Sequence, residues 1–173
     1  SRYPEFALSF YNLIPSCSFC NSILKNEKET VLDKHIHPYM DTDAGFEFTY
    51  NFIGKDTDGK NLYGVDCNIT AVGIKDKRRV KETLELFRIK EVYNAHAGLE
   101  LKDLIDLATA NPGDYIDELV NHVLANTHLT KEDVFRILFG VETLPNRYLN
   151  RPFSKFKMDI ISKIHDIIIN GKK

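Results

Sequence analysis

The fold is decided by an alternating stretch in the first half of the chain, FEFTYNFI (Phe46–Ile53), in which aromatic residues alternate with mostly polar ones. A period of two is typical of a half-buried β-strand. The stretch VDCNITAV (Val65–Val72) repeats the pattern after a polar connection that contains Asp58 and Gly59. We therefore predict an antiparallel β-hairpin with Cys67 as a small buried side chain, and we interpret the acidic connection as its turn. A calcium loop would need a terminal bidentate glutamate, which is missing.

Beyond Gly73 the apolar residues recur at helical spacing up to Pro112 and Gly113, which end or interrupt this arm. Further helices are predicted from about Asp114 to Asn126, after a cap at Thr130 with a stop at Gly140, and from around Pro152 to Gly171. The last helix carries an apolar stripe of Phe156, Ile160, Ile161, Ile164 and Ile168. The sequence thus predicts an α+β protein. Residues 1–74 form a small module that includes the hairpin, and residues 75–173 form a mostly helical domain.

The N-terminal module also carries three short words in a fixed order: NLIP (Asn12–Pro15), CSFCN (Cys17–Asn21) and HIHPY (His35–Tyr39). A Cys-x-x-Cys pair can hold one cation between two thiolates, and Asn21 follows it at a position suited to opening a helix. A lone Cys-x-x-Cys is weak, but the ordered set is more specific.

This order of words resembles the HNH, or ββα-metal, endonuclease superfamily, in particular its bacterial branch in which the cysteine pair is followed by His-Pro-Tyr. A further similarity is NRPFSKF (Asn150–Phe156). The resemblance implies an HNH-like module over residues 1–74 and hydrolysis of nucleic-acid phosphodiester bonds with Mg or Mn. The family's general-base histidine would lie just before Ser1. We expect the natural protein to supply it upstream, since the sequence begins in the middle of the motif.

The resemblance also implies roles for individual residues. Asn12 would orient the base histidine, Asn21 and His37 would hold the catalytic metal, and Cys17 and Cys20 would bind a structural zinc. Each has an alternative: a turn carboxamide for Asn12, a helix N-cap for Asn21, a packed or solvated ring for His37, and reduced packing thiols for the cysteines. Zinc would need two further ligands, because a closed structural site has four.

Charge and composition limit the partners. The formal net charge of −2 does not by itself indicate nucleic-acid binding, but two basic segments could contact phosphates, and otherwise they are solvated helix faces. They are Lys75, Lys77, Arg78, Arg79, Lys81, Arg88 and Lys90, and Arg147, Arg151, Lys155, Lys157, Lys163, Lys172 and Lys173. Three cysteines fit a reducing cytoplasm, and no apolar run reaches the roughly 20 residues of a membrane span.

We therefore expect a cytoplasmic protein with nucleic acid, DNA in particular, as its partner. A protein partner or homo-oligomer is a further expectation, and a membrane partner is not expected. The rival hypothesis is a catalytically inactive, zinc-stabilised subunit that binds nucleic acid or protein.

Overall fold

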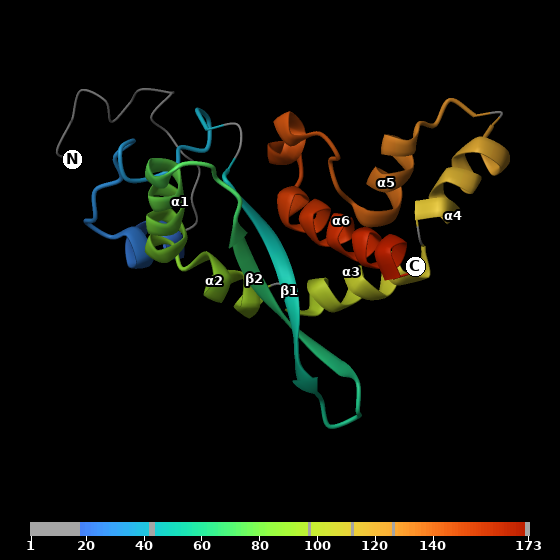
Figure 1. Cartoon of the computed structure of the whole chain (residues 1–173), viewed down its shortest axis with the longest axis horizontal. Coiled ribbons are helices and arrows are strands. Elements are labelled where there is room, and N and C mark those ends of the chain that lie inside the picture. Colours follow the sequence, from blue (N-terminus) through green and yellow to red (C-terminus); the bar gives the residue numbers. More distant parts are fainter. Residues whose placement is uncertain (1–17, 42–43, 97, 112, 126, 172–173) are drawn as a thin grey trace. The chain divides into compact units, whose positions relative to one another are not determined.

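The computed structural model describes residues 18–41, 44–96, 98–111, 113–125 and 127–171. Their elements are η3 (Phe19–Lys25), β1 (Phe46–Lys55), β2 (Asn61–Ile69), α1 (Ile74–Leu86), α2 (Ile89–His96), α3 (Gly98–Ala110), α4 (Gly113–Glu118), η4 (Leu119–Val123), α5 (Lys131–Phe139), η5 (Pro145–Asn150) and α6 (Ser154–Gly171) (Figure 1). The chain divides into two compact units: the first takes residues 1–45 and 71–89, and the second takes residues 46–70 and 90–173. The α+β class is confirmed. None of the described helices is long and apolar enough to cross a bilayer.

The predicted hairpin is confirmed. Strands β1 and β2 pair antiparallel, with Phe48 opposite Cys67. At the turn, Oδ1 of Asp56 accepts hydrogen bonds from the backbone N–H groups of Asp58 (2.9 Å) and Lys60 (2.8 Å). Gly59 adopts φ +76°, which favours glycine. The acidic connection is therefore a turn in which the carboxylate of Asp56 is hydrogen-bonded to the backbone of the turn.

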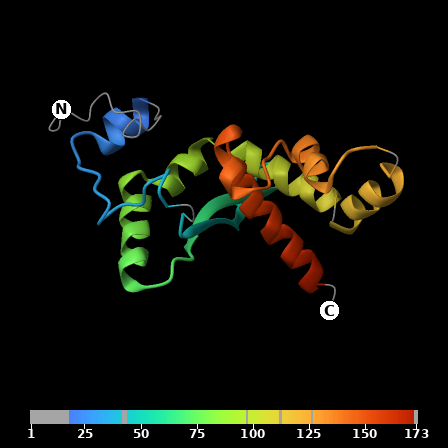
Figure 2. The same cartoon turned by 90° about the horizontal axis from the view of Figure 1, so that it is seen from above.

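The second unit is built around the apolar face of this hairpin and the apolar stripe of α6 (Figures 1 and 2). The ring of Phe48 meets that of Phe156 edge-on, with centroids 5.4 Å apart. Helix α3 packs against both α6 and β2. The buried apolar side chains of this unit are Phe48, Val65, Leu101, Leu104, Ile105, Ala108, Val134, Phe135, Phe139, Val141, Phe156, Ile160, Ile161 and Ile164. The predicted stripe of the last helix is thus part of the core.

Helix side chains cover both outer edges of the two-stranded sheet. Oδ2 of Asp159 on α6 accepts the outward N–H of Phe48 (2.9 Å). On the other edge, the carboxamide of Asn94 on α2 accepts from the N–H of Val65 and donates to its C=O, both at 2.8 Å. These contacts satisfy groups that an edge strand otherwise leaves open.

The first unit contains η3, α1 and the loop between η3 and β1. Among its described residues only Gly45, Val80 and Thr83 are buried. Polar contacts therefore carry much of its tertiary structure.

Local helix signals give mixed results. The cap at Thr130 is confirmed, since its hydroxyl accepts from the N–H of Asp133 in a capping box, and the stop at Gly140 is confirmed by its left-handed conformation. The last helix is predicted to begin around Pro152, and in the structure it begins slightly later. Helix α6 begins at Ser154, because Phe153 adopts φ +60° and breaks the helical path between them.

The long helical arm predicted after Gly73 is three helices, and Arg88, at φ +46°, separates α1 from α2. The units also group the chain differently from the predicted boundary between residues 74 and 75. The hairpin joins the C-terminal helices, whereas α1 joins the N-terminal residues.

Candidate functional site

Two of the predicted site residues lie on η3 in the first unit. Ser18 is the N-cap, so Asn21 is the third residue of the helix and not its cap. Its side chain is exposed, and its backbone C=O accepts from the N–H of Asn26 (3.1 Å). Cys20 is half-buried. Asn12 and Cys17 lie outside the described residues.

His37 caps a tight turn in the same unit. Its N–H donates to Oδ2 of Asp41 (2.6 Å), its C=O accepts from the N–H groups of Met40 and Asp41, and its Nδ1 accepts from the N–H of Tyr39 (3.3 Å). A neutral imidazole that accepts at Nδ1 carries its proton on Nε2. In this tautomer Nδ1 holds the hydrogen bond from Tyr39 and Nε2 carries the proton. A metal on His37 would therefore require the Tyr39 hydrogen bond to break.

His35 behaves in a similar way. Its Nδ1 accepts from the N–H of Val31 (3.3 Å), and its own N–H donates to the C=O of Val31 (2.9 Å). Each histidine thus organises its own turn. These hydrogen bonds favour a structural role for His37, and its metal role stays a prediction.

Arg79 on α1 holds this loop to the helix, an arrangement that we call the Arg79 clamp. Its guanidinium makes a bidentate pair with Asp41, Nη2 to Oδ2 at 2.9 Å and Nη1 to Oδ1 at 3.2 Å. Nη2 also donates to the C=O of His35 (3.0 Å). One turn further along α1, the hydroxyl of Thr83 accepts from the N–H of Ile36 (3.0 Å). The loop is therefore anchored at three residues, His35, Ile36 and Asp41.

The clamp is largely shielded from solvent. The side chain of Arg79 is 14% exposed, that of Asp41 is 23% exposed, and Nε of Arg79 is buried without a hydrogen-bond partner. Burial alone would raise the pKa of Asp41, but the hydrogen bonds from His37 and Arg79 outweigh it and lower the pKa from the ordinary 3.8. The hydrogen bond to Asp41 raises the pKa of Arg79. The pair is therefore fully ionised at neutral pH.

Sequence reasoning missed this cluster. Arg79 was grouped with exposed basic residues, and Asp41 was not singled out. The local signal was the spacing of His37 and Asp41, because a carboxylate four residues after the start of a turn can reach back to its first N–H. Nothing local could reveal the partner, since Arg79 lies 38 residues further along.

The two basic segments are mostly neutralised within the protein. On α1, Lys75 pairs with Asp33 (3.2 Å), Arg78 with Glu82 (3.7 Å) and Lys81 with Glu85 (3.8 Å). In the second unit the pairs are Lys90–Asp66, Arg151–Glu142, Lys155–Asp159, Lys157–Glu100 and Lys163–Glu47. Since a phosphate would compete with these carboxylates, the ion pairs favour the reading of both segments as solvated helix faces.

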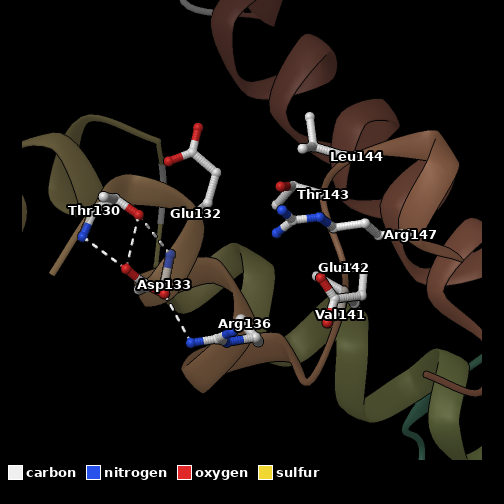
Figure 3. A pocket seen from close by; sticks show the side chains of 9 residues that line it. All are labelled: Thr130, Glu132, Asp133, Arg136, Val141, Glu142, Thr143, Leu144 and Arg147. Carbon is white, nitrogen blue, oxygen red and sulfur yellow. Dashed lines mark hydrogen bonds and ion pairs between the residues drawn. The ribbon is translucent and has the colours of Figure 1, made fainter. Parts of the chain in front are cut away.

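In the second unit a hollow of about 290 Å³ lies between the start of α5 and residues 141–147 (Figure 3). Arg136 on its wall pairs with Asp133 (2.7 Å), which also receives the capping hydrogen bonds of Thr130. The opposite wall contributes Thr143 and Arg147, and Glu132 borders the opening. Acidic and basic groups are mixed here, and the hydroxyl of Thr130 and the carboxylate of Asp133 form the cap of α5.

Cys67 is predicted to be a small buried side chain, and on β2 it is half-buried. Burial first, and then the charge of Asp66, raise the pKa of its thiol to about 11. The thiol is therefore protonated at neutral pH and is neither a metal ligand nor a nucleophile in this state.

No group of three or more His, Cys, Asp or Glu side chains within the described ranges could hold a metal ion. The described residues alone therefore do not fit a complete metal centre. Cys20, Asn21 and His37 all belong to the first unit. The roles assigned to Asn12, Cys17, Cys20, Asn21 and His37 stay predictions.

Comparison with known proteins gives a similarity to a phage protein. The chain is 33% identical over 109 residues to "Protein ea31" of Escherichia phage lambda, a match that covers 61% of this chain and 36% of the relative. The match thus spans about a third of the length of that protein, whose name states no activity. No family model matches the chain, and no solved structure matches it.

Proposed function

We propose that this chain is part of an HNH-type nuclease that hydrolyses nucleic-acid phosphodiester bonds. The observation that carries the proposal is the ordered set of words NLIP, CSFCN and HIHPY, together with the helix that starts at Phe19, within the Cys-x-x-Cys word, and presents Asn21 in its first turn. An exposed carboxamide there is accessible to a hydrated cation or to a substrate oxygen.

In this proposal the general base is the histidine that the resemblance assigns ahead of Ser1, and Asn12 orients it. Asn21 supplies an oxygen donor. A divalent ion bound at such a site would stabilise negative charge on the phosphoryl group. Because the described residues do not complete a metal centre, we assign no step of the reaction to the ion itself. The Arg79 clamp fixes the HIHPY turn, and with it the position of His37.

The test is plasmid nicking by the protein expressed from the natural start codon of its gene, with Mg²⁺ or Mn²⁺. Asn21→Ala should reduce nicking by about 10- to 100-fold or more, which is the scale of losing a contact at a metal centre. Asn146→Ala is the matched control, because Asn146 is an exposed asparagine on η5 in the second unit. Equal nicking by the two variants would show that Asn21 takes no part in the reaction. Nicking that continues in EDTA would contradict a metal-dependent mechanism.

The second candidate is a binding subunit without catalytic activity. The ion-paired cations favour it, as do the large apolar side chains that the first unit exposes, including Val72, Ile74 and Met40. Such side chains are typical of surfaces that dock another macromolecule. A folded protein that carries the upstream histidine and yet does not nick DNA or RNA would favour this candidate. Elemental analysis tests the zinc prediction separately.

A further inference from the structure

The two halves of the hairpin β1–β2 differ sharply in burial. Near the helices, Phe48 is 3% exposed and Val65 is 1% exposed, whereas toward the turn Phe52 is 58% exposed and Ile53 is 62% exposed. Figure 1 shows the turn extending beyond the helices of its unit. We call residues 50–55 and 60–64 the hairpin tip. The large apolar side chains of the hairpin tip are not packed into the core of the second unit.

The aromatic row of the core continues onto the tip. Phe52 lies opposite Tyr63, with ring centroids 6.3 Å apart, and Tyr63 also contacts Tyr50 at 5.8 Å. Side chains two residues apart on a strand, and those directly opposite across a pair, share one face of the sheet. These three rings therefore form one aromatic face. Because Phe52 meets Tyr63 at 73°, without parallel stacking, much of the Phe52 ring stays accessible.

Two lysines accompany this aromatic face, Lys55 at the end of β1 and Lys60 in the turn. Within the described residues neither ammonium lies at ion-pair distance from a carboxylate, in contrast to the lysines of α1 and α6 described above. Asp56 uses one carboxylate oxygen for two backbone N–H groups of the turn, and Asp58 is the other acidic residue there. The tip thus combines the exposed ring of Phe52 with two cations that have no ion-pair partner among the described residues.

We propose that the hairpin tip binds single-stranded nucleic acid, with a base stacked on Phe52 and the phosphates held by Lys55 and Lys60. Stacking platforms and backbone cations are the two requirements for binding single strands without sequence preference. The opposite side of the strand offers Ile53 and Leu62, which can neither stack like a ring nor attract phosphate. The tip belongs to the second unit, and the CSFCN and HIHPY words belong to the first. The proposal therefore does not depend on the nuclease proposal.

The experiment measures binding of a fluorescein-labelled oligo-dT by fluorescence anisotropy, in EDTA and at low salt, with the full chain. Phe52→Ala should weaken binding between about 5- and 150-fold, the range reported for loss of one stacking partner. Phe52→Tyr keeps the ring and should bind like the wild type. Ile53→Ala is the matched control, since it removes an equally exposed apolar side chain that does not stack, and it should leave binding unchanged.

Salt dependence tests the two lysines. The double variant with Lys55→Gln and Lys60→Gln should lose two phosphate contacts. The slope of the logarithm of the binding constant against the logarithm of the salt concentration should therefore become shallower by about 1.4, which is about 0.7 for each phosphate contact on a single strand. Circular dichroism of each variant reports whether the hairpin is retained. Double-stranded DNA of the same length should bind more weakly, because its bases are not free to stack.

Four outcomes would overturn the proposal. These are no binding of oligo-dT by the wild type, equal affinities of wild type and Phe52→Ala, equal losses in Phe52→Ala and Ile53→Ala, and equal affinity for double-stranded DNA. Dimerisation of the wild type that Phe52→Ala abolishes, in the absence of oligonucleotide binding, would assign the tip to a second copy of this chain. Since EDTA suppresses metal-dependent cleavage, none of these results depends on nuclease activity.

Discussion

The two units of this protein are stabilised in different ways. The second unit buries an apolar core from the hairpin and the helices α3, α5 and α6, whereas the first buries only Gly45, Val80 and Thr83 among its described residues. In place of a core, the first unit has the Arg79 clamp. Apolar burial is nearly independent of pH, and an ion pair is not. The two units should therefore respond to different perturbations.

This difference bears on function because the HNH-like words lie in the polar unit. A segment with few buried apolar contacts opens locally at low free-energy cost, and binding sites are often drawn from such segments. The CSFCN and HIHPY words would then gain order on binding a metal or a nucleic acid. Substitutions in one unit should also leave the other unchanged, which hydrogen exchange can measure separately for each.

The largest effect is expected from Phe156→Ala in the second unit. Phe156 is fully buried, and its ring contacts those of Phe48, Tyr93 and Phe153. Removing it leaves a cavity and should lower the free energy of unfolding of this unit by about 3–5 kcal/mol. Hydrogen exchange should accelerate in β1, α3 and α6 but not in α1.

Leu149→Ala is the control for this substitution, because it truncates an apolar side chain that is 76% exposed, and it should change stability little. If Phe156→Ala accelerated exchange in α1 as strongly as in α6, the two units would unfold as one, and the comparison would fail.

A smaller effect is expected from Asp41→Asn in the first unit. Asparagine keeps the volume and can still accept from the N–H of His37, but it removes the charge opposite Arg79, whose side chain is 14% exposed. Leaving this guanidinium without its partner should cost about 1–3 kcal/mol. Hydrogen exchange in the HIHPY turn and α1 should accelerate, with no change in α6.

The control is Asp33→Asn, which breaks the ion pair with Lys75. This pair lies on the surface, since the side chain of Lys75 is 66% exposed and that of Asp33 is 85% exposed. Exposed pairs contribute about 0–1 kcal/mol. Similar exchange rates in the two variants would show that the Arg79 clamp is no more important than a surface ion pair.

The features predicted from the sequence are those encoded by nearby residues. The hairpin follows from the alternation in β1 and β2, the cap of α5 from Thr130 and Asp133, and its end from Gly140. Each of these signals spans a few positions and needs no knowledge of the rest of the chain. The apolar stripe of α6 was predicted for the same reason.

The features that were missed depend on residues far apart in the sequence. The start of α6 is displaced from Pro152 because Phe153 adopts a positive φ, where its ring contacts those of Tyr93 and Phe156. The contact between Asp159 and the N–H of Phe48 spans 111 residues. No periodicity or motif marks such a pair, and the same holds for Asp41 and Arg79 in the candidate site. Sequence reasoning identified the words of the site but not the contacts that hold them.

The smallest effect is expected from acid, which tests the contribution of the Asp41 carboxylate to the Arg79 clamp. Because the pKa of Asp41 is lowered in the folded state, its contribution to stability is fully present above the ordinary aspartate pKa of 3.8. This contribution is lost as pH falls through the lowered folded-state pKa. In the wild type, hydrogen exchange in the HIHPY turn and α1, corrected for its intrinsic pH dependence, should therefore accelerate below pH 3.8. Asp41→Asn has no such carboxyl to titrate, so its exchange in these segments should already be fast at neutral pH and should change less over the same window. A wild-type profile that matched that of Asp41→Asn would mean that the HIHPY turn does not depend on the Asp41 carboxylate, and the polar account of the first unit would have to be abandoned.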